Sequence, residues 1–509
     1  MSELTSELKE VGIVLGGSTP SYAPVQLRKD VEDTVEEQQL AIIKDNKYPG
    51  KLFIGVLRGI KRLDPILRGN VRTPYVEYHE YWSQAYPEMS YTNVYVSLCS
   101  VIDPNSKKIE NCRIAPHPNS KVYVMTKKAS ILNEIEEAIR KTVQDDIYVG
   151  EQKYSGLRLP LNAYYARCHI GVFGATGMGK SRLVKALVDE LIKNYAIIIF
   201  DHTGVDYTPF YGEDYVISSK DIEISADAMS SVVLDMARLD RSTYSTYMDI
   251  ACMVFLKLLK GEEIPDSLSD LKLRFEKSKQ SMLILNEVEE DNLRKFIDVV
   301  RNVMRTLNAK QHTILKAELF IKEYMDKIFI DEVVNRRKRS PREIVQQALE
   351  LKGKSPLVIN LGDDTEIAVK RGIVYDIISA AWEIVKESRN PLNLGFVIDE
   401  AQNYAGEYTY PTNRIIEMTA REGRKWGLFV ILASQRVSRD ISTSIRANIN
   451  TVFFSKLQAT GDLREISGFL DIGGIEENDL ALLESRDFFV AGLMNPLRVP
   501  MLLRVREVS

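Results

Sequence analysis

The feature that most constrains this chain is a stretch of eight residues with the pattern G-x-x-x-x-G-K-S, a complete phosphate-binding loop. These residues are Gly174, Ala175, Thr176, Gly177, Met178, Gly179, Lys180 and Ser181. An apolar run at 170–173 precedes them and predicts a buried strand, and an amphipathic run at 183–191 predicts a helix. Strand, glycine-rich turn and helix therefore follow in the order that a nucleotide-binding α/β domain needs.

The chemistry of this loop follows from its residue types. The glycines let the backbone curl so that successive N–H groups point at phosphate oxygens, and the start of the helix adds a partial positive charge. We expect Lys180 to reach the β- and γ-phosphates of ATP and the Ser181 hydroxyl to ligate Mg²⁺. The alternative is a glycine-rich turn that only resembles the motif, and both flanking segments argue against it.

An acidic pair lies 220 residues after the loop lysine (400 − 180). An apolar run at 394–398 predicts a strand, and it ends in Asp399 and Glu400. An Asp at this position can hold Mg²⁺ through water, and an adjacent Glu can orient and deprotonate an attacking water. A solvated acidic turn is the alternative. Because a kinase does not need this Glu, the pair favours ATP hydrolysis.

Composition sets limits on the class of protein. A chain of 509 residues with 45% hydrophobic and 27% charged residues predicts two or three globular domains. The net charge of −4 argues against a simple nucleic-acid coating protein, but not against a ring with basic groups facing an inner channel. The four cysteines have no metal-ligand spacing, and neither a signal peptide nor an apolar run of membrane-spanning length is present. We therefore expect a cytoplasmic protein.

The pattern of strands and helices predicts four segments. Residues 1–150 read as a small β-barrel domain, 151–219 as the first part of an α/β core, 220–352 as a helical insertion, and 353–509 as the second part of the core. Helices are expected at 131–143, 293–307, 314–328, 367–387 and 413–425. Core strands are expected at 196–201, 357–361, 396–400, 428–433 and 451–457, and an antiparallel pair at 487–493 and 499–505. Asp201 ends the first of these strands and either faces the site or caps the next turn.

Two further polar signals lie in the second part of the core. Gln435 follows the strand at 428–433, where it can sense the γ-phosphate or only cap the strand. The run R-E-G-R-K-W-G at 421–427 places positive charge at a helix C-terminus, which is a structural use, although a protruding Arg can instead enter a neighbouring subunit's site. The basic run at 336–339 reads as a solvated helix end or, less well, as a nucleic-acid contact.

Five stretches in this order resemble the HerA-like branch of the HerA–FtsK superfamily of P-loop ATPases. They are the phosphate loop, F-D-H-T-G-V-D-Y at 200–207, V-I-D-E-A-Q at 397–402, R-E-G-R-K-W-G at 421–427 and A-S-Q-R at 433–436. With the β-rich N-terminal segment, the resemblance covers nearly the whole chain. It implies a RecA-like P-loop ATPase core with an N-terminal barrel and a helical insertion.

The resemblance also implies a function and roles for single residues. The family consists of hexameric translocases that act on duplex DNA, often with a nuclease of the NurA type, in DNA end processing or repair. The implied roles are ATP–Mg²⁺ binding by Lys180 and Ser181, metal ligation by Asp399, a catalytic base in Glu400, a sensor in Gln435, and an arginine finger acting in trans in Arg424. The implied cofactors are ATP and Mg²⁺.

Three departures from the family pattern stand out. The usual D-x-H-G-E-Y reads D-H-T-G-V-D-Y, which moves the acidic residue to Asp206, and Cys168 separates an otherwise adjacent Arg167 and His169. The C-terminal arm that braces neighbouring subunits is short or missing.

Three functions remain open from the sequence. The first is a motor that moves duplex DNA, with Arg436 and Arg439 as the expected channel residues. The second is an ATPase ring that scaffolds and activates a partner nuclease with little translocation. The third is an exporting ATPase of the conjugative type, which the missing membrane segment disfavours.

Overall fold

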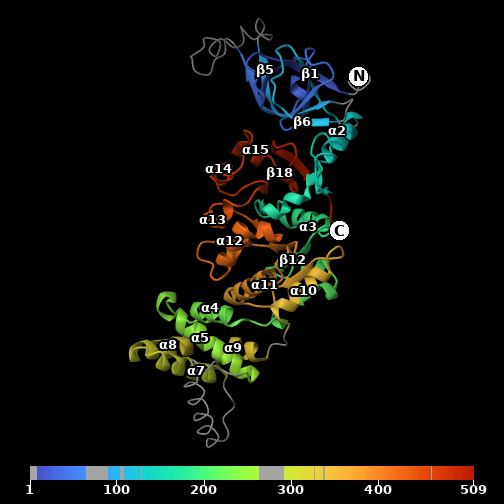
Figure 1. The fold of residues 1–509 in the computed structure, drawn as a ribbon. Coiled ribbons are helices and arrows are strands. Elements are labelled where there is room, and N and C mark those ends of the chain that lie inside the picture. Colours follow the sequence, from blue (N-terminus) through green and yellow to red (C-terminus); the bar gives the residue numbers. More distant parts are fainter. Residues whose placement is uncertain are drawn as a thin grey trace, which may run out of the picture. The chain divides into compact units, whose positions relative to one another are not determined.

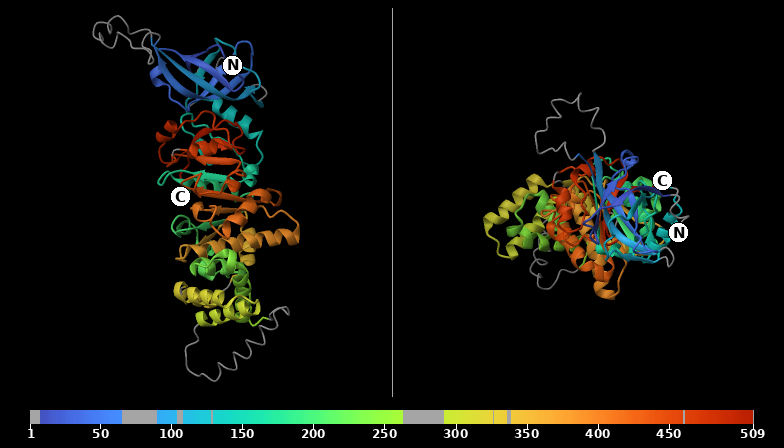
Figure 2. Two further views of the ribbon diagram at one scale, coloured as in Figure 1. Left: turned by 90° about the vertical axis from the view of Figure 1, so that its left-hand side faces the viewer. Right: turned by 90° about the horizontal axis from the view of Figure 1, so that it is seen from above.

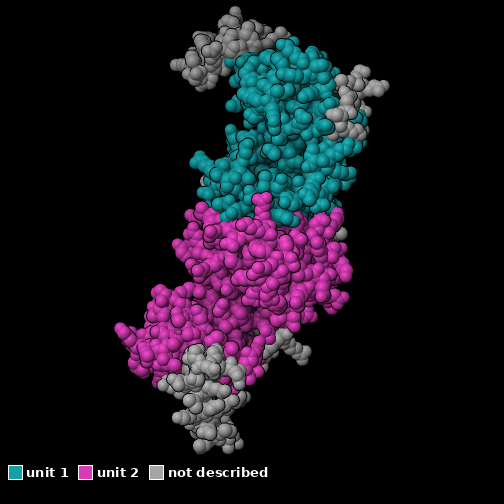
Figure 3. Space-filling view, in the orientation of Figure 1, with its two compact units in different colours: residues 1–191, 433–438, 446–509 teal, residues 192–432, 439–445 magenta. Residues whose placement is uncertain are grey.

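The fold is seen in a computed structural model of the chain (Figure 1). It describes residues 8–64, 90–103, 108–127, 129–262, 292–325, 327–335, 339–459 and 461–508. These residues form two compact units (Figure 3). The first unit contains residues 1–191, 433–438 and 446–509, and the second contains 192–432 and 439–445. The expected domain boundaries at 150, 219 and 352 stay predictions.

The N-terminal part of the first unit is a closed barrel of six antiparallel strands. In order around the barrel they are β2 (Tyr22–Leu27), β1 (Lys9–Val14), β7 (Lys121–Val124), β3 (Leu40–Lys44), β4 (Leu52–Leu63) and β5 (Tyr91–Asp103), and β5 pairs back with β2. A further strand, β6 (Lys108–Asn111), extends the edge of β5. Alternate residues of these strands fill the interior, and most of them are Val, Ile or Leu. The expected barrel is confirmed, and β2 and β3 complete it.

The rest of the first unit is a mixed sheet beside the barrel. Its strands, in spatial order, are β11 (Ile170–Phe173), β17 (Thr451–Phe454), β18 (Asp487–Gly492), β19 (Met501–Val505) and β9 (Gly150–Gln152). Only β11 and β17 are parallel, and the late strands β18 and β19 run antiparallel as predicted. Helix α2 (Ile131–Arg140) connects the barrel to this sheet, and α3 (Lys180–Leu191) follows β11.

A buried arginine joins the barrel to this sheet region. Arg58 of β4 is 1% exposed, and its guanidinium donates to the carbonyls of Gly473 and of Pro500, the latter at 2.7 Å. Gln152 of β9 adds a bond from its amide to the carbonyl of Gln38, at 2.7 Å. A charged side chain buried this deeply needs such acceptors, because an unpaired charge away from water is costly.

The second unit is built on a parallel sheet. The order of its strands is β13 (Val216–Ser218), β14 (Leu357–Asn360), β12 (Ala196–Asp201), β15 (Leu394–Ile398) and β16 (Leu428–Ser434), and all neighbouring pairs are parallel. The central strands are buried along their whole length, as parallel strands covered on both faces are. Helix α10 (Pro341–Glu350) packs against β12, and α11 (Ile367–Ser388) packs against α10 and α12 (Thr412–Glu422). The α/β class predicted from the sequence is confirmed.

A helical subdomain is inserted between β13 and β14, which are neighbours in the sheet. Its helices are α4 (Ala226–Met236), α5 (Arg241–Lys260), α7 (Asn292–Thr306), α8 (Gln311–Tyr324) and α9 (Lys327–Asn335). Figure 2 shows them, in green and yellow, gathered at one end of the second unit. Among the described helices, none is long and apolar enough to cross a bilayer.

Several predicted elements end at other residues in the structure. The helix expected at 314–328 is two helices, because Met325 is extended (φ −86°, ψ 128°) after α8. The helix expected at 413–425 stops at Glu422 and continues as a 3-10 turn, Gly423–Trp426, and a Cβ at Gly423 would lie 2.5 Å from the Leu428 carbonyl oxygen. The strand expected to reach 457 ends at Phe454, where the Ser455 hydroxyl donates to the Asp487 carbonyl at 2.6 Å.

Candidate functional site

The phosphate loop lies in the first unit, between β11 and α3. Gly177 and Gly179 have φ values of +83° and +92°, a region that side-chain-bearing residues rarely adopt. Lys180 is the first residue of α3. The backbone curl that the sequence predicted at these two positions therefore requires glycine.

Two residues, one at the end of β16 and one just beyond β17, hold the start of the loop. The N–H of Gly174 donates to the carbonyl of Ser434 at 3.3 Å, and the N–H of Ala175 donates to the carbonyl of Lys456 at 2.7 Å. Gln435 follows Ser434 directly, and its side-chain oxygen accepts from the Gln458 amide at 3.4 Å. Gln435, far from the loop in sequence, therefore directly follows a residue that contacts the loop, and its role as the sensor stays a prediction.

Lys180 is folded back onto its own loop. Its ammonium donates to the carbonyls of Gly174 at 2.8 Å and of Ala175 at 3.4 Å, and the residue is 9% exposed. A buried ammonium with this reach suits a polyphosphate, whose charge matches it better than neutral carbonyls do.

The acidic pair lies in the second unit, where β15 ends. Asp399 is 3% exposed, and burial raises its pKa to about 7, helped by the negative charges of Glu400 and Asp206. Glu400 has a left-handed backbone (φ 46°, ψ 50°), which is unusual for this residue type. Its carboxylate accepts a hydrogen bond from the Gln402 side-chain amide. The bond from Gln402 was not foreseen, although Gln402 lies in the V-I-D-E-A-Q stretch.

Asp201 caps the turn after β12. One carboxylate oxygen accepts from the N–H of Gly204 at 3.0 Å, and the other accepts from the N–H groups of Tyr207 and Thr208 at 3.0 and 2.9 Å. The Thr208 hydroxyl adds a fourth bond at 2.9 Å. Of the two interpretations left open by the sequence, these contacts support the cap.

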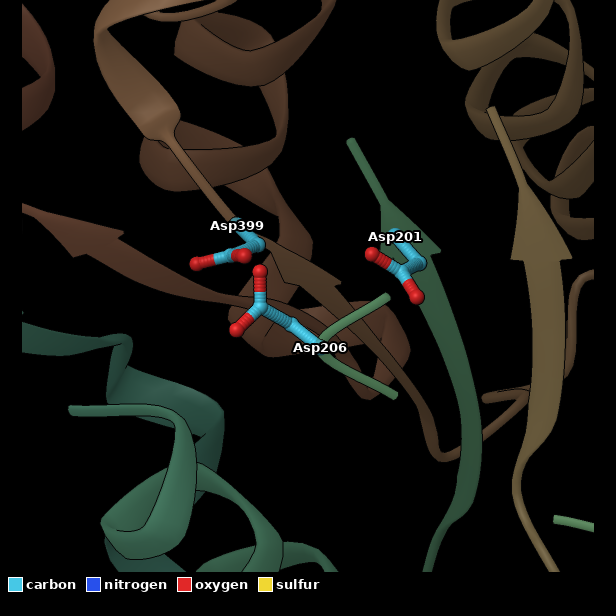
Figure 4. Close-up of side chains that lie close together, drawn as sticks. All are labelled: Asp201, Asp206 and Asp399. Carbon is cyan, nitrogen blue, oxygen red and sulfur yellow. The ribbon is translucent and has the colours of Figure 1, made fainter. Parts of the chain in front are cut away.

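Asp206 lies between the two buried aspartates in space (Figure 4). Asp201, Asp206 and Asp399 each place one carboxylate oxygen within 4.8 Å of the others. Carboxylate oxygens are the ligands that Mg²⁺ prefers, and a cation would relieve the like charges that raise the pKa of Asp399. The donor set therefore fits Mg²⁺. Because Asp201 is occupied by backbone N–H groups, Asp206 and Asp399 are the better ligands.

Helix α11 fixes both loops around these carboxylates. The Lys370 ammonium donates to the His202 carbonyl at 2.9 Å, and the Arg371 guanidinium donates to the Asn403 carbonyl at 2.7 Å. His202 also shares a hydrogen bond of 2.7 Å with the Tyr404 hydroxyl, and burial with the nearby Lys370 charge lowers its pKa. Sequence reasoning missed this arrangement. Its signal was the adjacent pair Lys370-Arg371 in a mostly apolar helix.

The predicted arginines differ in their surroundings. Arg424 is exposed, and within the described part of the chain no hydrogen bond or ion pair holds its guanidinium, whereas Arg421 lies 3.8 Å from Glu417. Arg439 is exposed and Arg436 is half-buried. Of the run at 336–339, residues 336–338 lie outside the described residues.

The departure at Arg167 and His169 leaves both residues ordered before β11. Arg167 stacks on the Tyr164 ring, with its guanidinium carbon 4.6 Å from the ring centroid. His169 is 2% exposed and has a φ of +67°, and Cys168 between them is equally buried.

Comparison with known families agrees with this arrangement. Residues 147–381 match the family model described as "Helicase HerA, central domain". This segment of the chain is HerA-like. The matched segment contains the phosphate loop and the loop with Asp201 and Asp206, and it ends before Asp399. No curated protein sequence matches the chain.

Several solved structures are similar at low identity. VirB4 of Thermoanaerobacter pseudethanolicus is 14% identical with a TM-score of 0.49, over 72% of this chain and 98% of that chain. The plasmid coupling protein TrwB in complex with ADP and Mg²⁺ is 16% identical with a TM-score of 0.48, over 73% and 92%. The genome packaging NTPase B204 from Sulfolobus turreted icosahedral virus 2 is 12% identical with a TM-score of 0.32, over 67% and 99%.

Proposed function

We propose that this HerA-like chain is an ATP hydrolase that moves duplex DNA. The observation that carries the proposal is the phosphate loop with its buried Lys180, joined in one chain to the acidic centre of Asp206, Asp399 and Glu400. Phosphoryl transfer to water needs a phosphate cradle, a metal held by oxygens, and a base for the water. This chain supplies residues for all three.

The residues take the following parts in this proposal. Lys180 leaves the carbonyls of Gly174 and Ala175 and binds the β- and γ-phosphates, while the loop N–H groups hold their oxygens. The Ser181 hydroxyl, Asp206 and Asp399 would hold Mg²⁺, which would neutralise phosphate charge when bound. Glu400 accepts the proton of the attacking water, and the Gln402 amide keeps its carboxylate oriented.

The proposal includes assembly into a hexamer. Arg424 would enter the site of a neighbouring subunit, and its exposed position without an acidic partner among the described residues supports this role. Gln435 would report the presence of the γ-phosphate. A nuclease of the NurA type is the proposed partner, in processing of DNA ends, on the strength of the family resemblance.

DNA must be held by local charge, because a net charge of −4 cannot attract it. We propose that Arg436 and Arg439, just after the sensor, contact the phosphate backbone. Such contacts are independent of base sequence and weaken steeply with salt.

The deciding experiment measures ATP hydrolysis with and without duplex DNA at low salt, on hexamers verified by native mass. We expect DNA to raise the rate several-fold, and Arg439→Ala to reduce the stimulated rate more than the basal rate. The matched control is Arg342→Ala, since Arg342 is already paired with Glu387. If duplex DNA leaves the rate of ATP hydrolysis unchanged, the motor function is contradicted. The alternative is then a ring that scaffolds and activates a nuclease.

A further inference from the structure

A short turn before β18 lies against the phosphate loop. The Ser485 hydroxyl donates to the Gly177 carbonyl at 3.1 Å, and the backbone N–H of Arg486 donates to the Met178 carbonyl at 2.9 Å. Both acceptors belong to the phosphate loop, and the N–H of Met178 itself donates to the Ala175 carbonyl at 3.3 Å. The turn is about 300 residues away in the chain, so no local motif specifies it.

The side chain of Arg486 runs along the loop beside its last glycine. A Cβ built on Gly179 would lie 3.6 Å from the Cγ of Arg486 and 3.6 Å from its backbone nitrogen. Gly179 directly precedes Lys180, so the stem of Arg486 contacts the loop at its phosphate-binding end. The φ of Arg486 is +74°, a strained value for this residue type, and the bond to Met178 holds it there.

The guanidinium of Arg486 has an exposed partner. It lies 3.0 Å from Glu507, and the two side chains are 21% and 88% exposed. An ion pair this open to water contributes little, because screening and side-chain entropy offset the attraction. The aliphatic part of the Arg486 side chain is fixed by its contact with the loop, whereas the ion pair with Glu507 is weak. The guanidinium is therefore the part of the side chain that can change partner.

We propose that Arg486 is a nucleotide-binding residue, whose guanidinium turns from Glu507 to the phosphates on the loop. The inference rests on the proposed ATP binding and adds a second cation, in the same subunit, to Lys180. Guanidinium groups bind phosphate oxygens in a bidentate manner, and a polyphosphate carries more charge than the single Glu507 carboxylate. Glu507 then acts as a competitor that holds Arg486 until nucleotide arrives.

The test is the dissociation constant of ATP–Mg²⁺, measured by isothermal titration calorimetry on the full chain. Arg486→Ala should weaken binding about tenfold, at the low end of what a hydrogen bond to a charged group contributes. Arg486→Lys should recover part of that loss. Glu507→Gln should tighten binding about two- to threefold, since it removes the competitor while leaving Arg486 in place.

The matched control is Arg504→Ala. Arg504 is paired with Glu484 at 3.0 Å in the same sheet and makes no described contact with the loop, so its loss should leave the dissociation constant unchanged. Lys180→Ala distinguishes a failure of the proposed ATP binding from a failure of the inference about Arg486. If the parent binds no ATP, the proposed function fails. If the parent binds and Lys180→Ala does not, an unchanged constant in Arg486→Ala overturns this inference alone.

The Glu507 variant keeps the proposal testable if Arg486→Ala does not fold. A purely structural ion pair predicts that Glu507→Gln lowers the melting temperature and leaves ATP affinity unchanged or weaker. That result would overturn the inference, whereas tighter binding supports it.

Discussion

The phosphate loop of the first unit and the acidic centre of the second unit are stabilised in different ways. The loop is shaped by backbone, since two glycines with positive φ and hydrogen bonds to its main-chain groups set its path. The acidic centre is shaped by side chains, because Asp201, Gln402 and Lys370 hold the turns that carry the carboxylates. We therefore expect single side-chain changes in the loop to affect ATP binding, and changes in the acidic centre to affect ATP hydrolysis.

The sharpest test of this comparison pairs Lys180→Ala with Glu400→Gln. Lys180→Ala should abolish ATP binding, because the phosphates lose their ammonium partner. Glu400→Gln should keep binding and lower turnover by about 10²- to 10⁴-fold, as loss of a general base does. Binding is measured by calorimetry and turnover by phosphate release. Equal turnover in Glu400→Gln and the parent would remove Glu400 from the proposed chemistry.

A second test asks whether the acidic centre is completed by another subunit. Arg424→Ala and Glu400→Gln should each be inactive alone, but mixed rings should recover a fraction of the parent hydrolysis rate. Some interfaces in such rings receive both intact residues. Native mass spectrometry checks that the rings are mixed. If proven mixed rings stay inactive, Arg424 acts within its own subunit or only supports the helix end.

A third test compares two aspartates within the acidic centre. Asp206→Asn should raise the Mg²⁺ concentration needed for half-maximal hydrolysis by about tenfold, in the range seen when groups around a metal are changed. Asp201→Asn should chiefly lower the melting temperature, because Asp201 accepts five hydrogen bonds from its own turn. The reverse pattern would make Asp201 the metal ligand.

A fourth test uses a carboxyl of the second unit that lies away from the acidic centre. Asp376 is 4% exposed and accepts from the N–H and hydroxyl of Ser225 at 2.7 and 2.5 Å. Burial raises its pKa from 3.8 to about 7, with Asp227 and Glu383 adding negative charge. The folded chain therefore binds this proton more tightly than the unfolded chain does, and stability is lost as pH rises from about 4 to 7.

Asp376→Asn should remove that loss, because the amide carries no charge at any pH. The loss in the free energy of unfolding that this carboxyl causes is at most about 4 kcal/mol, at 1.36 kcal/mol for each pKa unit. Calorimetric melting at pH 5.5 and pH 8 measures it, and the variant should lose less stability than the parent between the two values. Parallel loss in both proteins would contradict the raised pKa.

The sequence predicted the phosphate loop well because the residues of its motif and the elements on either side of it are local. Gly177, Gly179 and Lys180 are neighbours in the chain, and the strand and helix on either side have clear periodicity. The buried strand before Asp399 and the barrel strands β1, β4 and β5 were found for the same reason. In each, the local pattern and the final fold agree.

The contacts that position these groups could not be predicted, because they join distant segments. Arg486 reaches Met178, and Lys370 reaches His202, only after the sheets have formed. The break after α8 was missed since the apolar pattern continues through Met325. The acidic residue displaced to Asp206 still lies beside Asp399, and only the folded turn held by Asp201 reveals that.

The route of the chain between the two units has a consequence for its synthesis on the ribosome. β11 pairs with β17, and Ile170 is 281 residues ahead of its partner Thr451 (451 − 170). At roughly 5–20 residues per second, β11 waits about 15 to 55 seconds for β17 to be made. The barrel has all six strands before residue 125 and is free to fold at once. The nascent chain thus exposes an unpaired apolar strand beside a finished domain, which makes it a natural client for chaperones that bind such segments.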